Sequence, residues 1–331
     1  MRLAVISDTH VLGPGEHEID RDVVAGLLGS RGMLRGAWQH FLHAARKRFW
    51  NWKPESRRAC FFQALMDIQQ YGPDWVVANG DYGGDAAGIG LSDAATYESA
   101  AGAITLMREI FDGRCRFIFG DHDLGKYSTA LRQGGIRLAS LERGERDLQI
   151  QTFWHEQVEE VHLLGINSSL LTLDHFLPEA LAEEIPQWRE RQAAHEQQIT
   201  EAFDRLAPPE KIILFCHDPG ALGVLIRSPV IRQKQKQIAL TVLGHLHEPR
   251  LLTLVQRMPR WPNWRPKYPV ARIISESLKS AGTWSLFNPV VCPSPFGTGH
   301  HLSGGVLFIE RSPEQQWLIR RHRICLPRHA R

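Results

Sequence analysis

Residues 116–123 read RFIFGDHD, a largely apolar run that ends at a glycine followed by two carboxylates and an imidazole. Four other stretches share this design: LAVISDTH at 3–10, WVVANGD at 75–81, IILFCHD at 212–218 and LTVLGHLH at 240–247. A short continuous apolar run bounded by polar or glycine positions predicts a strand buried on both faces. The chain is therefore expected to contain five buried strands, each followed at once by side chains that can bind protons or metals.

Helical patterns lie between these runs. A helix is predicted over 56–71, another over about 94–112 with Ser92 or Asp93 as its cap, and a long polar one from Pro178 to about 206. Strands and helices in alternation indicate an α/β fold. After about residue 248 the pattern changes to short strands, including 305–309 and 317–319, which predict an antiparallel completion of the same sheet system. One domain over 1–331 is expected.

The five strand-end segments carry eight side chains suited to metal binding. Loops at the carboxyl ends of strands in an open α/β sheet converge on one crevice. Imidazole and carboxylate ligands together suit Zn, Mn or Fe. The set exceeds the needs of one tetrahedral ion and fits two ions that share a bridging carboxylate; its members are Asp8, His10, Asp81, Asp121, His122, His217, His245 and His247.

The ordered set Asp-x-His, Gly-Asp, Gly-Asp-His-Asp, a strand-end His and Gly-His-x-His resembles the calcineurin-like metallophosphoesterase superfamily, and especially its bacterial cyclic-nucleotide-phosphodiesterase-like members. The resemblance covers residues 8–247. It implies a two-sheet α/β/β/α sandwich with the metal site at the carboxyl ends of the strands. It also implies the hydrolysis of a phosphoester by a metal-activated water.

The resemblance further implies a role for each motif residue. Two divalent or mixed-valence ions (Mn, Fe or Zn) are expected, with Asp81 as the bridge between them. His122 is expected to lie beside the substrate as proton donor or electrostatic clamp, oriented by Asp123. The first ion would be held by Asp8, His10 and His247, and the second by Asp121, His217 and His245.

Position 121 departs from the family pattern, which usually has Asn there. Asp121 still offers an oxygen ligand, but three carboxylates then face two ions where two usually do. The ion pair is expected to be less positive, which makes it a poorer Lewis acid and raises the pKa of the bound water. On this reasoning Asp121→Asn is expected to raise activity or lower its pH optimum.

Residues 31–58 form a basic, Trp-rich insertion with eight Lys or Arg residues against one Glu. Leu, Phe and Trp residues are interleaved with these charges, as in an amphipathic helix. We favour a helical cap over the active-site cleft. The alternatives are contact with an anionic membrane surface and, least favoured, contact with a nucleic-acid backbone.

Other candidates have two interpretations each. Asp85 either lies beside the metal ligands or belongs to a turn. Asp218 is expected to cap the following turn rather than to orient a ligand. The segment Asn167-Ser168-Ser169 is either a strand-end turn or a neighbour of the site. His300 and His301 are expected to be exposed rather than to line the pocket.

Composition excludes several classes of protein. Of 331 residues 43% are hydrophobic, which is enough for a large core and excludes wholesale disorder. Five scattered cysteines exclude a disulfide framework and fit a reducing compartment. The net charge of +3 gives no overall signature of nucleic-acid binding. With no long apolar run and no signal-like segment, a cytoplasmic protein is expected, with possible contact at the inner membrane surface.

The expected substrate is a small phosphoester of nucleotide type. A phosphodiester or a nucleotide-linked pyrophosphate is favoured over a simple monoester, because the insertion is similar to one in related phosphodiesterases and basic residues lie near the expected cleft. Two alternatives stay open. One is a metal-binding scaffold with weak or no activity, because of Asp121. The other is a DNA or RNA nuclease.

Overall fold

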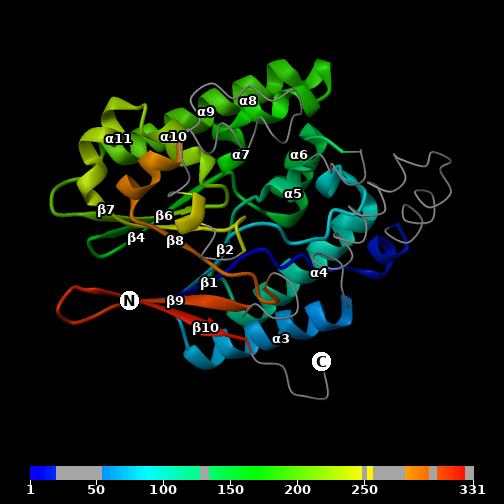
Figure 1. Cartoon of the computed structure of the whole chain (residues 1–331), viewed down its shortest axis with the longest axis horizontal. Helices are drawn as coiled ribbons and strands as arrows, with labels where there is room; N and C mark the ends of the chain where they lie inside the picture. The colour runs from blue at the N-terminus through cyan, green and yellow to red at the C-terminus, as the bar shows by residue number, and fades with distance from the viewer. Residues whose placement is uncertain (20–53, 127–133, 248–251, 256–279, 298–303, 325–331) are drawn as a thin grey trace.

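The computed structural model describes residues 1–19, 54–126, 134–247, 252–255, 280–297 and 304–324. Two five-stranded sheets stack face to face, and helices cover the outer face of each (Figure 1). The layers therefore run helix, sheet, sheet, helix, which confirms the predicted α/β/β/α sandwich. Residues 31–53 of the predicted insertion, and His300 and His301, lie outside the described residues.

The first sheet has the strand order β10-β9-β1-β2-β3. Its first three strands along the chain, β1, β2 and β3, are parallel to one another, and β9 pairs antiparallel with both β1 and β10. The two last strands thus complete a sheet begun by the first residues of the chain, as predicted. The bounds are β1 Arg2–Ile6, β2 Trp75–Ala78, β3 Cys115–Phe117, β9 Gly305–Arg311 and β10 Trp317–Arg323.

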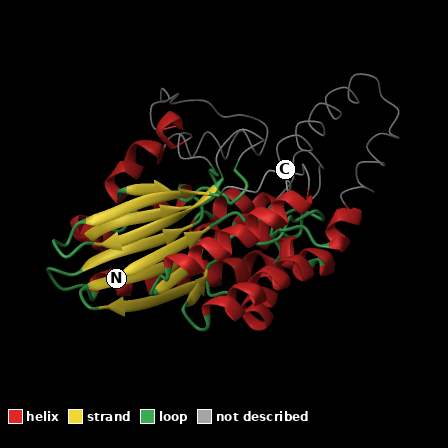
Figure 2. Ribbon diagram, turned by 90° about the horizontal axis from the view of Figure 1, so that it is seen from below, coloured by secondary structure: helices red, strands yellow, loops and turns green. Residues whose placement is uncertain are grey.

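The second sheet has the order β4-β5-β6-β7-β8. Strands β5 to β8 are parallel, and β4 pairs antiparallel with β5 across a tight turn. In Figure 2 the strands of both sheets lie along nearly the same axis. The bounds are β4 Phe153–Val158, β5 Val161–Ile166, β6 Lys211–Cys216, β7 Ile238–Leu243 and β8 Pro289–Val291.

Two long helices cover the first sheet and three helices cover the second (Figure 1). The first pair is α3 Pro54–Tyr71 and α4 Ala94–Phe111; the other three are α9 Ile185–Asp204, α10 Gly220–Leu225 and α11 Pro229–Lys234. Asp93 caps α4 by accepting a hydrogen bond from the Thr96 amide, as predicted. The shorter elements are α5 Asp121–Leu124, α6 Leu138–Leu148, α7 Ser168–Leu171, α8 Leu173–Phe176, and the 3₁₀ turns η1 Gly90–Ser92, η2 Leu177–Glu179, η3 Ala182–Glu184, η4 Gln235–Gln237 and η5 Ser285–Phe287.

Strand β1 shows how the apolar runs bury both of their faces. Leu3 and Val5 pack between the two sheets, whereas Ala4 and Ile6 pack under α3 and α4. This alternation follows from the two-residue period of a strand. Because neither face meets water, the run is apolar throughout, and its first polar residues mark the carboxyl end of the strand.

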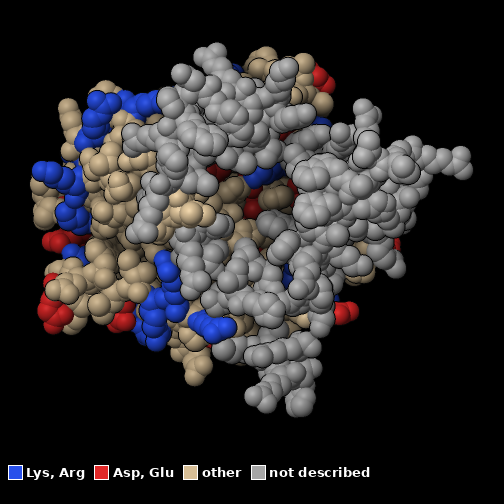
Figure 3. Space-filling view, viewed as in Figure 1, with Lys and Arg blue, Asp and Glu red and all other residues tan. Residues whose placement is uncertain are grey.

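Charged side chains of both signs are dispersed over the described part of the face in Figure 3. None of the helices among the described residues combines the length and the apolar composition needed to cross a bilayer.

The predicted start of the long helix at Pro178 is wrong, because α9 begins at Ile185. Pro178 belongs to η2, and the extended backbone of Ala180 and Leu181 then breaks the helical path. The Glu184 carboxylate accepts hydrogen bonds from the Leu138 amide and from the Trp188 indole, which fixes the true start of the helix against α6. Sequence pattern alone cannot separate two 3₁₀ turns from the helix that follows them.

His195 ties α9 to the carboxyl end of β5. The residue is buried, and its Nε2 accepts a hydrogen bond from the Asn167 amide at 3.2 Å. Burial lowers the pKa of His195 from 6.5 to about 4, because a charged imidazolium is costly away from water.

Between pH 6.5 and pH 4, His195 is therefore protonated in the unfolded chain but not in the folded chain. His195 contributes stability above pH 6.5 that is lost as the pH falls through this window, by about 3 kcal/mol. His195→Gln keeps an acceptor but does not titrate. We expect its unfolding free energy in urea to fall less steeply than that of the wild type between pH 6.5 and pH 4. Parallel pH profiles for the two proteins would contradict this assignment.

Candidate metal centre

The five predicted ligand loops meet at one place between the sheets. Loops after β1, β2 and β3 of the first sheet bring the carboxylates and His10, and loops after β6 and β7 of the second sheet bring His217, His245 and His247. Within each of four groups, the potential ligand atoms lie within 4.8 Å of one another. The groups are Asp8-His10-His247, Asp121-His217-His245, Asp8-Asp81-His217 and Asp81-Asp121-His122.

Asp81 lies between the two three-residue sets expected to hold the two ions. One of its oxygens, Oδ2, is 3.1 Å from His217 Nε2 and 3.7 Å from His10 Nε2. Its other oxygen accepts a hydrogen bond from the His122 amide at 3.0 Å. A single oxygen placed between imidazoles from opposite sets is the arrangement that a bridging carboxylate requires.

The first set combines a carboxylate with two neutral imidazoles. His247 Nε2 lies 3.2 Å from Asp8 Oδ1, and the rings of His10 and His247 stack with centroids 5.3 Å apart. Burial lowers the pKa of His10 to about 3 and holds the pKa of His247 well below its usual range. Both rings are therefore neutral near pH 7, which is the form of histidine that binds metal ions.

The orientation of the His217 ring shows that these nitrogen and oxygen donors fit a metal ion. Its Nδ1 is 2.7 Å from the Asn79 carbonyl oxygen, so that Nδ1 carries a proton and donates it. Nε2 then points at oxygens of Asp81, Asp121 and Asp8, at 3.1, 3.7 and 3.9 Å. A bare lone pair facing carboxylates is repulsive, so a cation, either a proton or a metal ion, has to lie between them.

His10 has the same orientation, with Nδ1 at 3.2 Å from the Gly83 carbonyl oxygen. A backbone carbonyl at one ring nitrogen is the usual support of a metal-binding histidine, because it fixes both the tautomer and the direction of the other nitrogen. The residues present thus fit two cations held by nitrogen and oxygen ligands.

Asp8, Asp81 and Asp121 place three carboxylates in one buried cluster. Burial, together with repulsion from Asp81, raises the pKa of Asp8 to about 6. Buried like charges are stable only when cations compensate them. The cluster is therefore built for positive charge.

Lys126 supplies part of that charge and was not anticipated from the sequence. Its Nζ lies 2.6 Å from Asp121 Oδ2. Burial favours the protonated form of Asp121, but the Lys126 ammonium and the His245 imidazole outweigh it and hold the pKa of that carboxyl well below its usual range. The sequence alone led us to expect that Asp121 makes the two metal ions together less positive. The Lys126 ammonium corrects this expectation, because it offsets the charge of the Asp121 carboxylate.

The predicted role of Asp123 as the group that orients His122 is wrong. One oxygen of Asp123 accepts hydrogen bonds from the amides of Asp81 and Gly120 at 2.9 and 2.8 Å, and the other accepts from the Tyr82 amide at 3.0 Å. Asp123 therefore clamps the backbone that carries Asp81. Its partners are main-chain groups, which a sequence motif does not reveal.

Asp85 faces His122 instead. Its Oδ2 lies 3.6 Å from His122 Nδ1, and the Asp85 side chain is buried. Burial opposes a charged His122, but Asp81 and Asp85 outweigh it and raise the pKa of His122 to about 9. Cations bound to Asp81 would offset part of this rise. Both interpretations of Asp85 therefore hold, because its Oδ1 accepts a hydrogen bond from the Gly90 amide of its own loop at 2.8 Å while Oδ2 lies beside the site.

Glu16 holds the loop that carries Asp85. The carboxylate is buried and accepts hydrogen bonds from the amides of Gly84 and Ala86 at 3.0 and 2.9 Å. Glu16 is another functional support that sequence reasoning missed, because no motif surrounds it.

The ligand loops are held in strained backbone. Six residues of the site adopt positive φ, a conformation that costs roughly 1–3 kcal/mol outside glycine: Asp8, His10, Asp81, Asp85, His245 and His247. The glycines of the motifs permit close packing of these loops. A Cβ on Gly120 would overlap the Asp81 carboxylate, and Gly80 itself has φ +90° and lies against Gly120.

Phe296 and Arg57 form a wall beside the first set. The Phe296 ring lies 6.3 Å from the rings of both His10 and His247. The Arg57 guanidinium stacks over Phe296 at 4.4 Å, and its Nη1 donates to the His10 carbonyl oxygen at 3.4 Å. An aromatic ring and an arginine therefore lie at the metal-ligand cluster.

The remaining candidates have structural roles. Asp218 accepts a hydrogen bond from the Gly220 amide at 2.7 Å and so caps the following turn, as predicted. Asn167 caps α7, and Ser168 Oγ accepts from the Asp218 amide at 3.0 Å, beside His217. The segment is thus a strand-end turn that also supports the loop carrying a candidate ligand.

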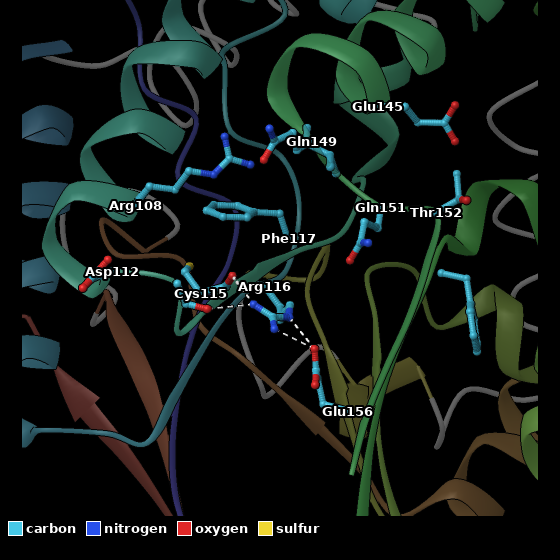
Figure 4. A pocket seen from close by; sticks show the side chains of 13 residues that line it. Arg108, Asp112, Cys115, Arg116, Phe117, Glu145, Gln149, Gln151, Thr152 and Glu156 are labelled. Atoms are coloured by element: carbon cyan, nitrogen blue, oxygen red, sulfur yellow. Dashed lines mark hydrogen bonds and ion pairs between the residues drawn. The ribbon is translucent and has the colours of Figure 1, made fainter. Parts of the chain in front are cut away.

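A groove of about 870 Å³ lies elsewhere, between the edge strands β3 and β4 (Figure 4). Arg116 crosses it to pair with Glu156 at 2.6 Å, and Arg108 stacks on Phe117. None of its lining residues belongs to the metal-ligand cluster.

Asp81→Asn tests the bridging position. The substitution removes the charge shared by both sets, so we expect the variant to lose most of its bound metal, measured as metal per chain by elemental analysis after dialysis. Asp112→Asn is the matched control, because Asp112 also has positive φ but is exposed and lies before β3. An Asp81→Asn protein that keeps two ions per chain would contradict this geometry.

Comparisons with known proteins identify the family. No curated protein matches the chain. Similar solved structures include a dimetal phosphatase from Danio rerio (12% identity, TM-score 0.48, covering 98% of this chain and 96% of that one). They also include GAP50, the anchor in the inner membrane complex of Plasmodium (11%, 0.43, 99% and 90%), and Yfce, a phosphoesterase from E. coli (10%, 0.32, 98% and 100%).

The sequence profile of the calcineurin-like phosphoesterases matches residues 1–249 of the 331. This match covers the five ligand loops that the structure brings together. The chain therefore belongs to the calcineurin-like phosphoesterase family and is a metal-dependent phosphoesterase.

Proposed function

We propose that the protein hydrolyses a phosphodiester or a nucleotide-linked pyrophosphate, with two metal ions held by the seven predicted ligands. The observation that carries the proposal is Asp81 Oδ2, which lies between His10 and His217. When bound, two such ions supply the positive charge that polarises a phosphoryl group and activates water for attack on phosphorus. We propose Mn, Fe or Zn for these ions because the candidate ligands are nitrogen and oxygen donors, which suit these metals.

His122 is proposed to donate a proton to the leaving oxygen. Its ring is about one-fifth exposed, while the amide of the same residue is bound to Asp81. Asp85 faces Nδ1 and stabilises the protonated ring, so that His122 can carry a proton to a substrate near the ions. General acid catalysis of this kind contributes roughly 10²–10⁴-fold.

Arg57 and Phe296 support a substrate with a second group beyond the reacting phosphate. The partly exposed Phe296 ring, about 6 Å from two candidate ligands, offers a surface for a base or another flat group, and the buried Arg57 guanidinium stacked on it adds positive charge nearby. This surface favours an ester that carries a flat group over a simple alkyl phosphate. The basic residues of 31–58 add sequence support for an anionic substrate larger than phosphate.

We further propose that residues 31–58 contact either the substrate or an anionic membrane surface from the cytoplasmic side. The alternating basic and Trp-rich composition supports both contacts. A lipid-linked nucleotide would satisfy both at once.

Turnover of matched substrates tests the proposed function. With added Mn²⁺, we expect the protein to cleave bis(p-nitrophenyl) phosphate and a nucleotide-linked pyrophosphate faster than p-nitrophenyl phosphate. His122→Ala is expected to slow a phosphodiester with an alkoxide leaving group by roughly 10²–10⁴-fold, because the alkoxide has to be protonated as it leaves, and to slow the activated nitrophenyl diester by less, because nitrophenolate leaves without protonation.

His155→Ala, on the edge strand β4, is the control and is expected to leave both rates unchanged. Equal losses on the two substrates in His122→Ala would indicate a clamp on the phosphoryl oxygen. A metal-loaded protein that turns over none of these esters would favour the scaffold alternative and contradict the proposal.

A further inference from the structure

We propose that Asp121 and Lys126 act together as one neutral ion pair at the second metal position, in which Lys126 sets the charge that the metal ion meets. Asp121 would give one carboxylate oxygen to the metal ion and the other to the Lys126 ammonium. The inference deepens the proposed function and rests on its assignment of Asp121, His217 and His245 to one ion.

The geometry divides the two oxygens of Asp121 between different partners. Oδ2 lies 2.6 Å from Lys126 Nζ, whereas Oδ1 faces His217 Nε2 at 3.7 Å. His245 Nδ1, which is assigned to the same ion, also lies 3.3 Å from Oδ2, so Lys126 and His245 both neighbour this oxygen. A carboxylate can serve both neighbours because both of its oxygens accept. An asparagine has one oxygen only, and its NH₂ group would be directed at the ammonium or at the histidines.

Local backbone fixes the ammonium at this place. Helix α5 ends at Leu124, and the φ of +100° at the following Gly125 turns the chain back toward the start of the helix. The Lys126 amide then donates to the Asp121 carbonyl oxygen at 3.1 Å. A Cβ on Gly125 would press against the Ile89 backbone, so this turn needs glycine. The pairing is therefore built by the six-residue segment from Asp121 to Lys126.

The charge balance explains why the pair occurs in place of a neutral ligand. Asp8 and Asp81 together remove two of the four positive charges of two divalent ions. Asp121 removes a third, and Lys126 restores it. The site then has the same net charge as one with an amide at position 121, but only while both members of the pair are present.

Metal affinity separates this proposal from a purely structural ion pair. Titration calorimetry with Mn²⁺ is to be performed on the metal-free wild type, Asp121→Asn, Lys126→Met and the double variant. Asp121→Asn leaves an ammonium without its carboxylate and is expected to weaken Mn²⁺ binding by about tenfold or more. Lys126→Met leaves an uncompensated carboxylate and is expected to strengthen Mn²⁺ binding and slow turnover. The double variant is expected to bind within about threefold of the wild type.

Lys236→Met, an exposed lysine before β7, is the matched control and is expected to change nothing. If Lys126→Met does not fold, comparison of Asp121→Asn with the double variant suffices, because removal of the ammonium should then raise affinity about tenfold. Weaker binding in both single variants, or additive losses in the double variant, would overturn the ion-pair proposal while leaving the metal site intact. A wild type that binds no Mn²⁺ would instead overturn the metal assignment itself.

Discussion

Mutual repulsion among Asp8, Asp81 and Asp121 is the constraint on which the site depends. Three neighbouring parallel strands of one sheet end in these carboxylates, and none of them reaches water. Such a cluster is stable only with cations in it. The histidines and the lysine around it are placed accordingly, since His217 and His10 direct Nε2 at the carboxylates and Lys126 pairs with Asp121.

The two-sheet stack makes this convergence possible. Strands of the first sheet bring the carboxylates, strands of the second bring most of the imidazoles, and an apolar layer between the sheets holds their carboxyl ends together. The positive φ of the ligand residues is a local cost that the buried strands before them offset. Asp123 and Glu16 add hydrogen bonds to the loop amides, so that the ligands keep their directions.

The sequence predicted the five strands that carry the ligands and the groups that meet, because each apolar run ends at its ligands and parallel strands bring those ends together. The two-sheet sandwich followed from the family resemblance. It did not predict which side chains pair within the cluster. Lys126 depends on a glycine turn after α5, and Asp85 depends on a loop held by Glu16; neither lies in a recognisable motif. Asp123 was misassigned because its partners are backbone amides, which leave no trace in the sequence.

We propose that two cations lie in this cluster with Asp81 between them. Anomalous diffraction from crystals of Mn²⁺-loaded protein, recorded on both sides of the manganese absorption edge, tests it most directly. We expect two anomalous peaks roughly 3.5–4 Å apart, one beside Asp8, His10 and His247 and the other beside Asp121, His217 and His245, with an Asp81 oxygen between them. A single peak, or two peaks with Asp81 turned away from both, would contradict it.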